Sequence, residues 1–227
     1  MTYNAIILGT DHNSYSVARS FYEAYGKKPI VAGSAVLVPF YKSKIADIYT
    51  AKDFSSDDEV FVKTLNDLAK ARDEEDFIFF APTEHYVDLL LRNIDKLDFS
   101  YRVPYPNPEE AAKLIKKSEF YKLLEKFGLP YPKTFRAARD NWKDLDLDGE
   151  LFLKADEYDD FIASDIKVKQ KGYHVKDKRK ALDVLENIYD SDYQGHVIVQ
   201  EFIHGGQGSE YSLNGYRAKD GSISVSY

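Results

Sequence analysis

Apolar and polar positions change their spacing repeatedly along the first hundred residues. Short apolar runs predict strands, and they occur at residues 4–9, 28–34, 47–51 and 76–82. Longer stretches with apolar residues at every third or fourth position predict amphipathic helices, and they occur at residues 16–26, 57–73 and 83–97. Alternation of strand and helix favours an α/β fold with a parallel sheet and helices on its faces.

Capping residues and prolines mark where several elements begin and end. The helix that starts near residue 57 has acids in its first turn, and Thr83 is a candidate N-cap for the next helix. Three prolines within residues 104–108 then interrupt the pattern, so we expect a domain boundary near residue 105. Asn107 and Pro108 have the residue types of Ncap and N1 positions and predict a further helix.

After these prolines the predicted elements are mainly strands. A helix at residues 118–128 is followed by an extended stretch, LPYPKTF. The remaining elements are predicted strands at 150–161, 167–175 and 196–203, a helix at 179–190, and a hairpin at 211–227 that turns at Asp220 and Gly221. The pattern therefore predicts an α+β domain at residues 106–227 that follows the α/β domain at residues 1–105.

Composition narrows the class of protein. With 227 residues, 44% hydrophobic and 30% charged, the chain is long enough for one large or two small soluble domains and has no membrane-span pattern. A net charge of −7 argues against nucleic acid as a partner. The absence of cysteine excludes disulfides and thiolate metal sites, and the opening MTYNAIILG lacks the features of a signal peptide, so we expect a cytoplasmic protein.

Several isolated residues are weak candidates for chemistry. Gly9 stands where a dinucleotide-binding fingerprint would start, but the later glycines of that fingerprint are absent, so a strand-to-helix turn is the preferred interpretation. Arg19 either binds a substrate carboxylate or forms an ion pair on the helix surface. The histidines show no metal-ligand spacing, and we interpret them as structural or surface residues; they are His12, His85, His174, His196 and His204.

Two lysines are stronger candidates when they are considered together. Lys154 lies inside the apolar strand LFLKA, where an ammonium is costly to bury unless an anion meets it; the alternative is a side chain that reaches solvent at the strand end. Lys117 stands beside Lys116, and such a pair is typical of a solvated face. Lysines from two separate elements can nevertheless bracket a polyphosphate.

The order of segments in the second half resembles that of the ATP-grasp superfamily. Lys117 followed by FGLPYPKTF resembles the lysine-helix and Pro-x-Thr signature of that superfamily, and LFLKA resembles its lysine-bearing strand. VQEFIHG resembles the hinge between its two lobes, and GSEYSLNGYRAKDGSI resembles the acid-starting strand of the carbamoyl phosphate synthase and D-alanine ligase branches. The N-terminal GTDHNSYSVARSFYEAYGKKP resembles the pre-ATP-grasp domain of bacterial carboxylate–amine ligases, some of which are D-aspartate ligases. The resemblance extends over essentially the whole chain.

This resemblance implies a reaction and a set of ligands. It implies an ATP-dependent ligase that uses Mg²⁺ and activates a small-molecule carboxylate as an acyl phosphate for attack by an amine. Residues 1–105 would form the pre-ATP-grasp domain, and residues 106–227 would form the nucleotide-binding lobe. Lys117 and Lys154 would donate to the α- and β-phosphates.

The resemblance also implies how the adenosine would be bound. The main chain at Glu201 and Ile203 would read the adenine, in a hinge segment that also contains Gln200 and Phe202, and the glycine-rich HGGQG would let the chain leave the pocket in a tight turn. Glu210 would accept the ribose hydroxyls or approach the metal. The competing interpretation is a plain β-hairpin with a glycine loop and an exposed acid.

Two segments depart from the family pattern. In the hinge loop, His204, Gly206 and Gln207 stand where the resembling carboxylate–amine ligases have proline and glycine followed by acids. The second segment is the phosphate loop. Where many members have a glycine-rich phosphate loop, ADEYDDFIASDIKVKQKG has a single glycine and four acids before Ile162. Lys167, Lys169 and Lys171 either form a basic edge that offsets these acids or line one solvated face.

The acids and arginine that the family carries on its larger C-terminal lobe are not recognisable here. Downstream of the hinge the available acids are Glu210 and Asp220, so metal ligands and catalytic residues stay unassigned. We expect residues 1–227 to represent the N-terminal part of such a ligase and not to turn over ATP by themselves. At the strand SISVSY we expect self-association or disorder. The alternatives are a non-catalytic adenine-nucleotide-binding or interaction module, and a dinucleotide-binding protein that uses Gly9.

Overall fold

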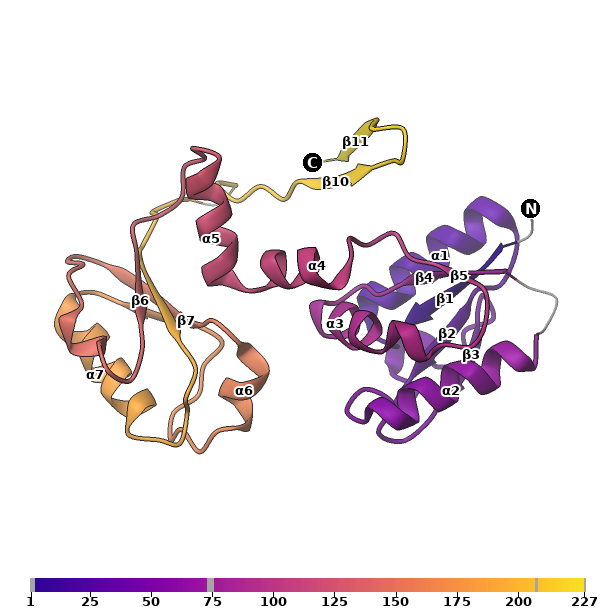
Figure 1. The fold of residues 1–227 in the computed structure, drawn as a ribbon, viewed down its shortest axis with the longest axis horizontal. Coiled ribbons are helices and arrows are strands. Elements are labelled where there is room, and N and C mark those ends of the chain that lie inside the picture. Colours follow the sequence, from indigo (N-terminus) through magenta and orange to yellow (C-terminus); the bar gives the residue numbers. More distant parts are fainter. Residues whose placement is uncertain (1–2, 73–75, 207, 227) are drawn as a thin grey trace. The chain divides into compact units, whose positions relative to one another are not determined.

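The strands of the first half form one parallel sheet, as the alternating pattern predicts. The computed structural model describes residues 3–72, 76–206 and 208–226, and its first sheet has the strand order β3-β2-β1-β4-β5 with every neighbouring pair parallel (Figure 1). The strands are β1 (Tyr3–Leu8), β2 (Ile30–Gly33), β3 (Asp47–Thr50), β4 (Asp76–Phe80) and β5 (Tyr101–Arg102). The helices are α1 (His12–Tyr25), α2 (Asp58–Lys70), α3 (Glu84–Asn93) and α4 (Pro108–Ile115), with short 3-10 helices η1 (Val38–Phe40) and η2 (Ile94–Lys96).

The turn after β1 depends on a glycine. Gly9 has φ +94°, and its amide donates to the carbonyl of Ala32 at 2.7 Å. A Cβ at this position would lie 2.8 Å from the Tyr86 ring and 2.9 Å from Oγ of Ser14. Asp11 then caps α1 by accepting from the amide of Ser14. The predicted turn at Gly9 is therefore confirmed, although the helix begins at His12 and not at residue 16.

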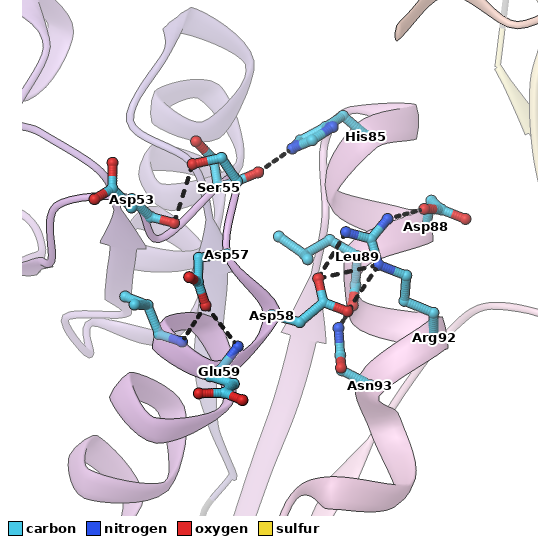
Figure 2. A network of polar contacts seen from close by, with 12 residues as sticks. Asp53, Ser55, Asp57, Asp58, Glu59, His85, Asp88, Leu89, Arg92 and Asn93 are labelled. Carbon is cyan, nitrogen blue, oxygen red and sulfur yellow. Dashed lines mark hydrogen bonds and ion pairs between the residues drawn. The ribbon is translucent and has the colours of Figure 1, made fainter. Parts of the chain in front are cut away.

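A polar network joins α2 to α3 (Figure 2). The guanidinium of Arg92 donates to both carboxylate oxygens of Asp58, at distances from 2.8 to 3.3 Å, and to the carboxylate of Asp88 at 2.5 Å. The hydrogen bond with Arg92 lowers the pKa of Asp58. Nε2 of His85 lies 2.6 Å from the carbonyl oxygen of Ser55. These contacts connect the start of α2, and the turn before it, to successive turns of α3.

The second half contains a separate antiparallel sheet with the strand order β6-β9-β7-β8, and a two-stranded hairpin, β10-β11. Its strands are β6 (Thr134–Ala137), β7 (Leu151–Ala155), β8 (Tyr173–Val175), β9 (Val197–Glu201), β10 (Asn214–Arg217) and β11 (Ile223–Ser226). Its helices are α5 (Lys117–Lys126), α6 (Tyr158–Ala163) and α7 (Lys178–Tyr189), with a 3-10 helix η3 (Trp142–Asp144). Helix α7 and one face of the four-stranded sheet enclose a hydrophobic core that includes Leu153, Leu185 and Val199.

The chain divides into two compact units, residues 1–115 and 116–227, each with its own sheet. The proline cluster predicts a boundary near residue 105, whereas α4 belongs to the first unit. The assignment of the units to a pre-ATP-grasp domain and a nucleotide-binding lobe stays a prediction. No helix among the described residues combines the length and apolar character needed to cross a membrane.

Several boundaries predicted from the sequence are wrong. The strand predicted at residues 150–161 ends at Ala155 and is followed by α6, and the strand predicted at 167–175 is reduced to β8. The short strand β5 was not predicted. Asp73, Gln207 and Tyr227, which fall in predicted segments, lie outside the described residues. The predicted caps at Thr83 and Asn107 are confirmed, since their side chains accept from the amides of Tyr86 and Glu110.

The geometry at Gly9 predicts a specific loss of stability. Gly9→Ala should lower the free energy of unfolding by about 2 to 4 kcal/mol, because it adds a steric clash to an unfavourable φ. Gly26→Ala is the control, since Gly26 also has positive φ, +62°, but its Cβ would meet nothing within 4 Å; the expected cost is about 1 to 2 kcal/mol. Denaturant unfolding measures both, and equal losses would contradict the close approach at Gly9.

Candidate functional site

The four-stranded sheet has one apolar face and one face with polar side chains. Side chains alternate along a strand, so Leu151, Leu153 and Ala155 of β7 face the core beneath α7 while Lys154 faces the other way. Lys154 is paired directly with Ile198 of β9, which is fully buried. The lysine is therefore paired with β9 one residue before the end of β7, beyond the last residue that pairs with β8.

Helix α5 contacts this polar face through Tyr121. The ammonium of Lys154 donates to the hydroxyl of Tyr121 at 3.0 Å, and that hydroxyl donates to Oε1 of Gln200 at 3.0 Å. The ring of Tyr121 stacks on Tyr131, with ring centroids 5.5 Å apart. Lys117 is one helical turn before Tyr121, so both residues lie on the same side of α5. The two lysines predicted from sequence thus come from elements that are in contact.

Asp156 attaches the start of α5 to the end of β7. Its carboxylate accepts from the amide of Ser118 at 3.0 Å, and its main-chain carbonyl accepts from the ammonium of Lys117 at 3.2 Å. Lys116, at the N-cap, supplies no side-chain cap of its own. Asp156 is only 3% exposed and takes that capping role from a distant position in the sequence.

The charges around Asp156 are arranged in pairs. A guanidinium nitrogen of Arg136 lies 3.7 Å from Oδ2 of Asp156 and 3.2 Å from Nδ1 of His196. In the described part of the chain, this Oδ2 has no hydrogen-bond partner. Burial, reinforced by Arg136, lowers the pKa of His196. Lys116 forms an ion pair with Glu157, and this bond raises the pKa of Lys116.

Lys117 and Lys154 differ from these paired cations. Within the described residues neither lysine forms an ion pair; each has a neutral acceptor, the Asp156 carbonyl for Lys117 and the Tyr121 hydroxyl for Lys154. Both ammonium charges are held in place without a compensating carboxylate. Such an arrangement suits an anionic ligand, because charge-assisted bonds to phosphate form without breaking an existing ion pair.

The segment after β9 lines a hollow of about 570 Å³, a size within the range of small-molecule sites. Its lining residues are Phe202, Ile203, His204, Gly205, Gly206, Gly208, Ser209 and Glu210. The ring of Phe202 stacks on His174 at 3.9 Å between centroids. Neither Lys117 nor Lys154 lines the hollow, so its lining comes from the segment after β9.

The hinge residues predicted from sequence are divided between structural and exposed positions. The side-chain amide of Gln200 accepts from Tyr121 through Oε1 and donates to Thr134 through Nε2. The carboxylate of Glu201 accepts from the amide of Lys133 at 3.0 Å. Phe202, Ile203 and Glu210 line the hollow, and within the described residues the amide of Ile203 has no hydrogen-bond partner. The ligand roles assigned to these residues and to Lys117 and Lys154 stay predictions.

Residues outside this site have simpler explanations. Arg19 pairs with Glu23 at 2.7 Å on the exposed side of α1, which confirms the surface ion pair. Asp220 accepts from the amide and hydroxyl of Ser222 in the hairpin turn. Among the described residues no three acids or histidines come close enough to hold a metal ion. No metal ligand is therefore assigned among the described residues.

Comparisons with known proteins identify ligases. The chain is 30% identical over 227 residues to D-aspartate ligase of Enterococcus faecium, an alignment that covers 96% of this chain and 54% of that protein. The chain therefore spans about half the length of this curated relative. No protein-family model matches.

Two of the solved structures that resemble the fold of this chain are ligases. The L-amino acid ligase of Bacillus licheniformis superposes with a TM-score of 0.62 at 14% identity, covering 90% of this chain and 45% of that one. The D-alanine–D-alanine ligase of Bacillus anthracis in complex with ATP gives a TM-score of 0.50 at 14% identity, covering 89% and 60%. At these identities the likeness concerns the fold alone.

The lowered pKa of His196 predicts a pH dependence of stability. In the unfolded chain His196 binds a proton with an ordinary pKa of about 6.5, and in the folded chain it binds the proton less readily. The stability that comes from this difference is therefore complete above that pH, and it is lost as the pH falls toward the pKa of His196 in the folded chain. His196→Gln should therefore lose less unfolding free energy than the unmodified chain between about pH 7 and pH 5.5. His12→Gln, on exposed helix surface, is the control. Parallel urea-unfolding profiles for the chain and His196→Gln would contradict this prediction.

Proposed function

We propose that the chain belongs to the ATP-grasp superfamily of ligases and that residues 116–227 form its adenine-nucleotide-binding lobe. The observation that carries this proposal is the pair Lys117 and Lys154. Their ammonium groups are anchored by neutral oxygens from connected elements, and within the described residues neither has a carboxylate partner.

In this proposal Lys117 and Lys154 donate to phosphate oxygens of ATP. The α5 terminus is held by Asp156, which directly follows the strand that carries Lys154, so a single residue couples the positions of both lysines. A phosphate group replaces no ion pair at either lysine and gains a charge-assisted bond from each. Lys116 is paired with Glu157 and takes no part.

The adenosine occupies the hollow beside Phe202. The main chain at Glu201 and Ile203 reads the adenine, and the hydrophobic side chains of Phe202 and Ile203 form its walls. Glu210 accepts from the ribose hydroxyls. The main chain turns closely at Gly205, because a Cβ there would lie 2.7 Å from Cβ of Ser209. This close turn supports the proposed pocket at the hollow.

The reaction proposed for the ligase is carboxylate–amine ligation. A carboxylate oxygen of the acid substrate attacks the γ-phosphorus of ATP and ADP leaves; an amine then attacks the carbonyl carbon of the acyl phosphate and phosphate leaves. The 30% sequence identity to a D-aspartate ligase supports D-aspartate as the acid substrate. Small-molecule carboxylate and amine are the partners in this proposal.

The phosphate role of Lys154 predicts a loss of affinity. Lys154→Ala should weaken ATP binding by about tenfold or more, because a charge-assisted hydrogen bond contributes about 1.5 to 3 kcal/mol. Lys143→Ala, which removes an equal charge from exposed surface, should leave affinity unchanged. Isothermal titration calorimetry measures both. Equal affinities for the chain and Lys154→Ala would remove Lys154 from the phosphate site.

The choice of acid is tested on the gene product that contains these residues. ADP release should rise when D-aspartate is added with an amine acceptor, and L-aspartate should give less than about a tenth of that rate, since a pocket that positions one enantiomer leaves polar groups of the other unpaired. Equal stimulation by the two enantiomers, or none by either, would contradict D-aspartate as the substrate.

A further inference from the structure

A continuous chain of hydrogen bonds runs from Lys154 to a main-chain carbonyl. The ammonium of Lys154 donates to the Tyr121 hydroxyl at 3.0 Å, which donates to Oε1 of Gln200 at 3.0 Å. Nε2 of Gln200 donates to Oγ1 of Thr134 at 2.8 Å, and this hydroxyl donates to the carbonyl of Pro132 at 2.7 Å. Four secondary-structure elements, β7, α5, β9 and β6, and the loop before β6 contribute to this series of hydrogen bonds.

The direction of every hydrogen bond in this series follows from the acceptor at its end, the carbonyl of Pro132. The carbonyl of Pro132 can only accept, so the hydroxyl of Thr134 must give its single proton to it. Thr134 can then only accept from Gln200, which fixes the amide with Nε2 toward Thr134 and Oε1 toward Tyr121. The hydroxyl of Tyr121 is thereby a donor to Gln200, and the oxygen of Tyr121 is left to accept from residue 154.

This series of hydrogen bonds therefore requires a hydrogen-bond donor at position 154. A lysine ammonium meets this requirement with one of its three N–H groups, and the other two remain for a ligand. Gln200 is only 5% exposed, so solvent cannot readily replace the Tyr121 hydroxyl as a donor to its Oε1. The positions of Tyr121 and Gln200 are thus linked.

We propose that Tyr121, supported by Gln200 and Thr134, is a positioning residue that holds the ammonium of Lys154 ready for phosphate. This inference rests on the proposed phosphate role of Lys154 and assigns a further residue to that site. A free lysine side chain has many rotamers, and ordering it on binding reduces affinity. Tyr121 restricts those rotamers before the nucleotide arrives, and it uses a neutral oxygen that leaves the positive charge available.

The first test is the affinity of Tyr121→Phe for ATP. This variant removes only the hydroxyl and should weaken ATP binding by about 3- to 10-fold. Tyr131→Phe is the matched control, because it removes a hydroxyl from the other ring of the same stack and should bind ATP like the unmodified chain. Unchanged affinity in Tyr121→Phe would overturn the inference.

A double-mutant cycle separates positioning from general structural support. In a Lys154→Ala background, Tyr121→Phe should cause no further loss of affinity, because the hydroxyl acts through the lysine. An equal loss in both backgrounds would show that Tyr121 does not act through Lys154 and would overturn the inference. If Lys154→Ala alone leaves affinity unchanged, the phosphate role in the proposed function fails instead.

A second measurement needs no nucleotide. Mass spectrometry can follow the acylation of individual lysines by an amine-reactive ester, with Lys143 as the internal reference. Tyr121→Phe should raise the rate at Lys154 about 3-fold or more relative to Lys143, because the amine loses the hydrogen-bond partner that restrains it. An unchanged relative rate would show that Tyr121 does not hold Lys154, whatever the outcome with ATP.

Discussion

An ammonium group on a partly buried sheet face requires polar partners, and the contact of α5 with the sheet meets this requirement at Lys154. A carboxylate partner would neutralise the charge, whereas the Tyr121 hydroxyl satisfies one N–H and leaves the charge in place. The position of Tyr121 in turn requires that α5 lie against the sheet. Asp156 supplies that attachment through its bond to the amide of Ser118.

The same attachment joins the helix that carries Lys117 to the strand that carries Lys154, in a chain with a net charge of −7. Acids are numerous near the end of β7, but the structure commits them: Glu157 pairs with Lys116, and Asp156 interacts with Ser118 and Arg136. Two of the four acids before Ile162, Asp156 and Glu157, are thus residues that fix the cationic elements. Local pairing, not net charge, therefore determines what this face can bind.

Local sequence signals predicted much of the fold. The strands and helices of the first unit follow from periodicity, and caps such as Thr83 and Asn107 depend on residues only three positions away. Helix α6 and strand β5 were missed because six and two residues are too few to show a period. Lys154 and Lys117 were recognisable as candidates from an apolar strand and from resemblance to a known motif order.

The partners of these lysines were not predictable, since they are distant in sequence. Tyr121 is 33 residues from Lys154 and 79 from Gln200, and Ser118 is 38 from Asp156. No periodicity links such pairs; they depend on the register of β7 and β9 and on where α5 lies. The one available signal was the spacing of Lys117 and Tyr121 by one helical turn.

The central claim is that Lys117 and Lys154 meet the phosphates of ATP. An ATP derivative with an acyl group on its terminal phosphate transfers that group to lysines beside the bound phosphates, and mass spectrometry identifies the acylated residues. The account predicts acylation at Lys154 and Lys117 that excess ATP suppresses by about tenfold or more. Acylation confined to exposed lysines such as Lys143, with no protection by ATP, would contradict it.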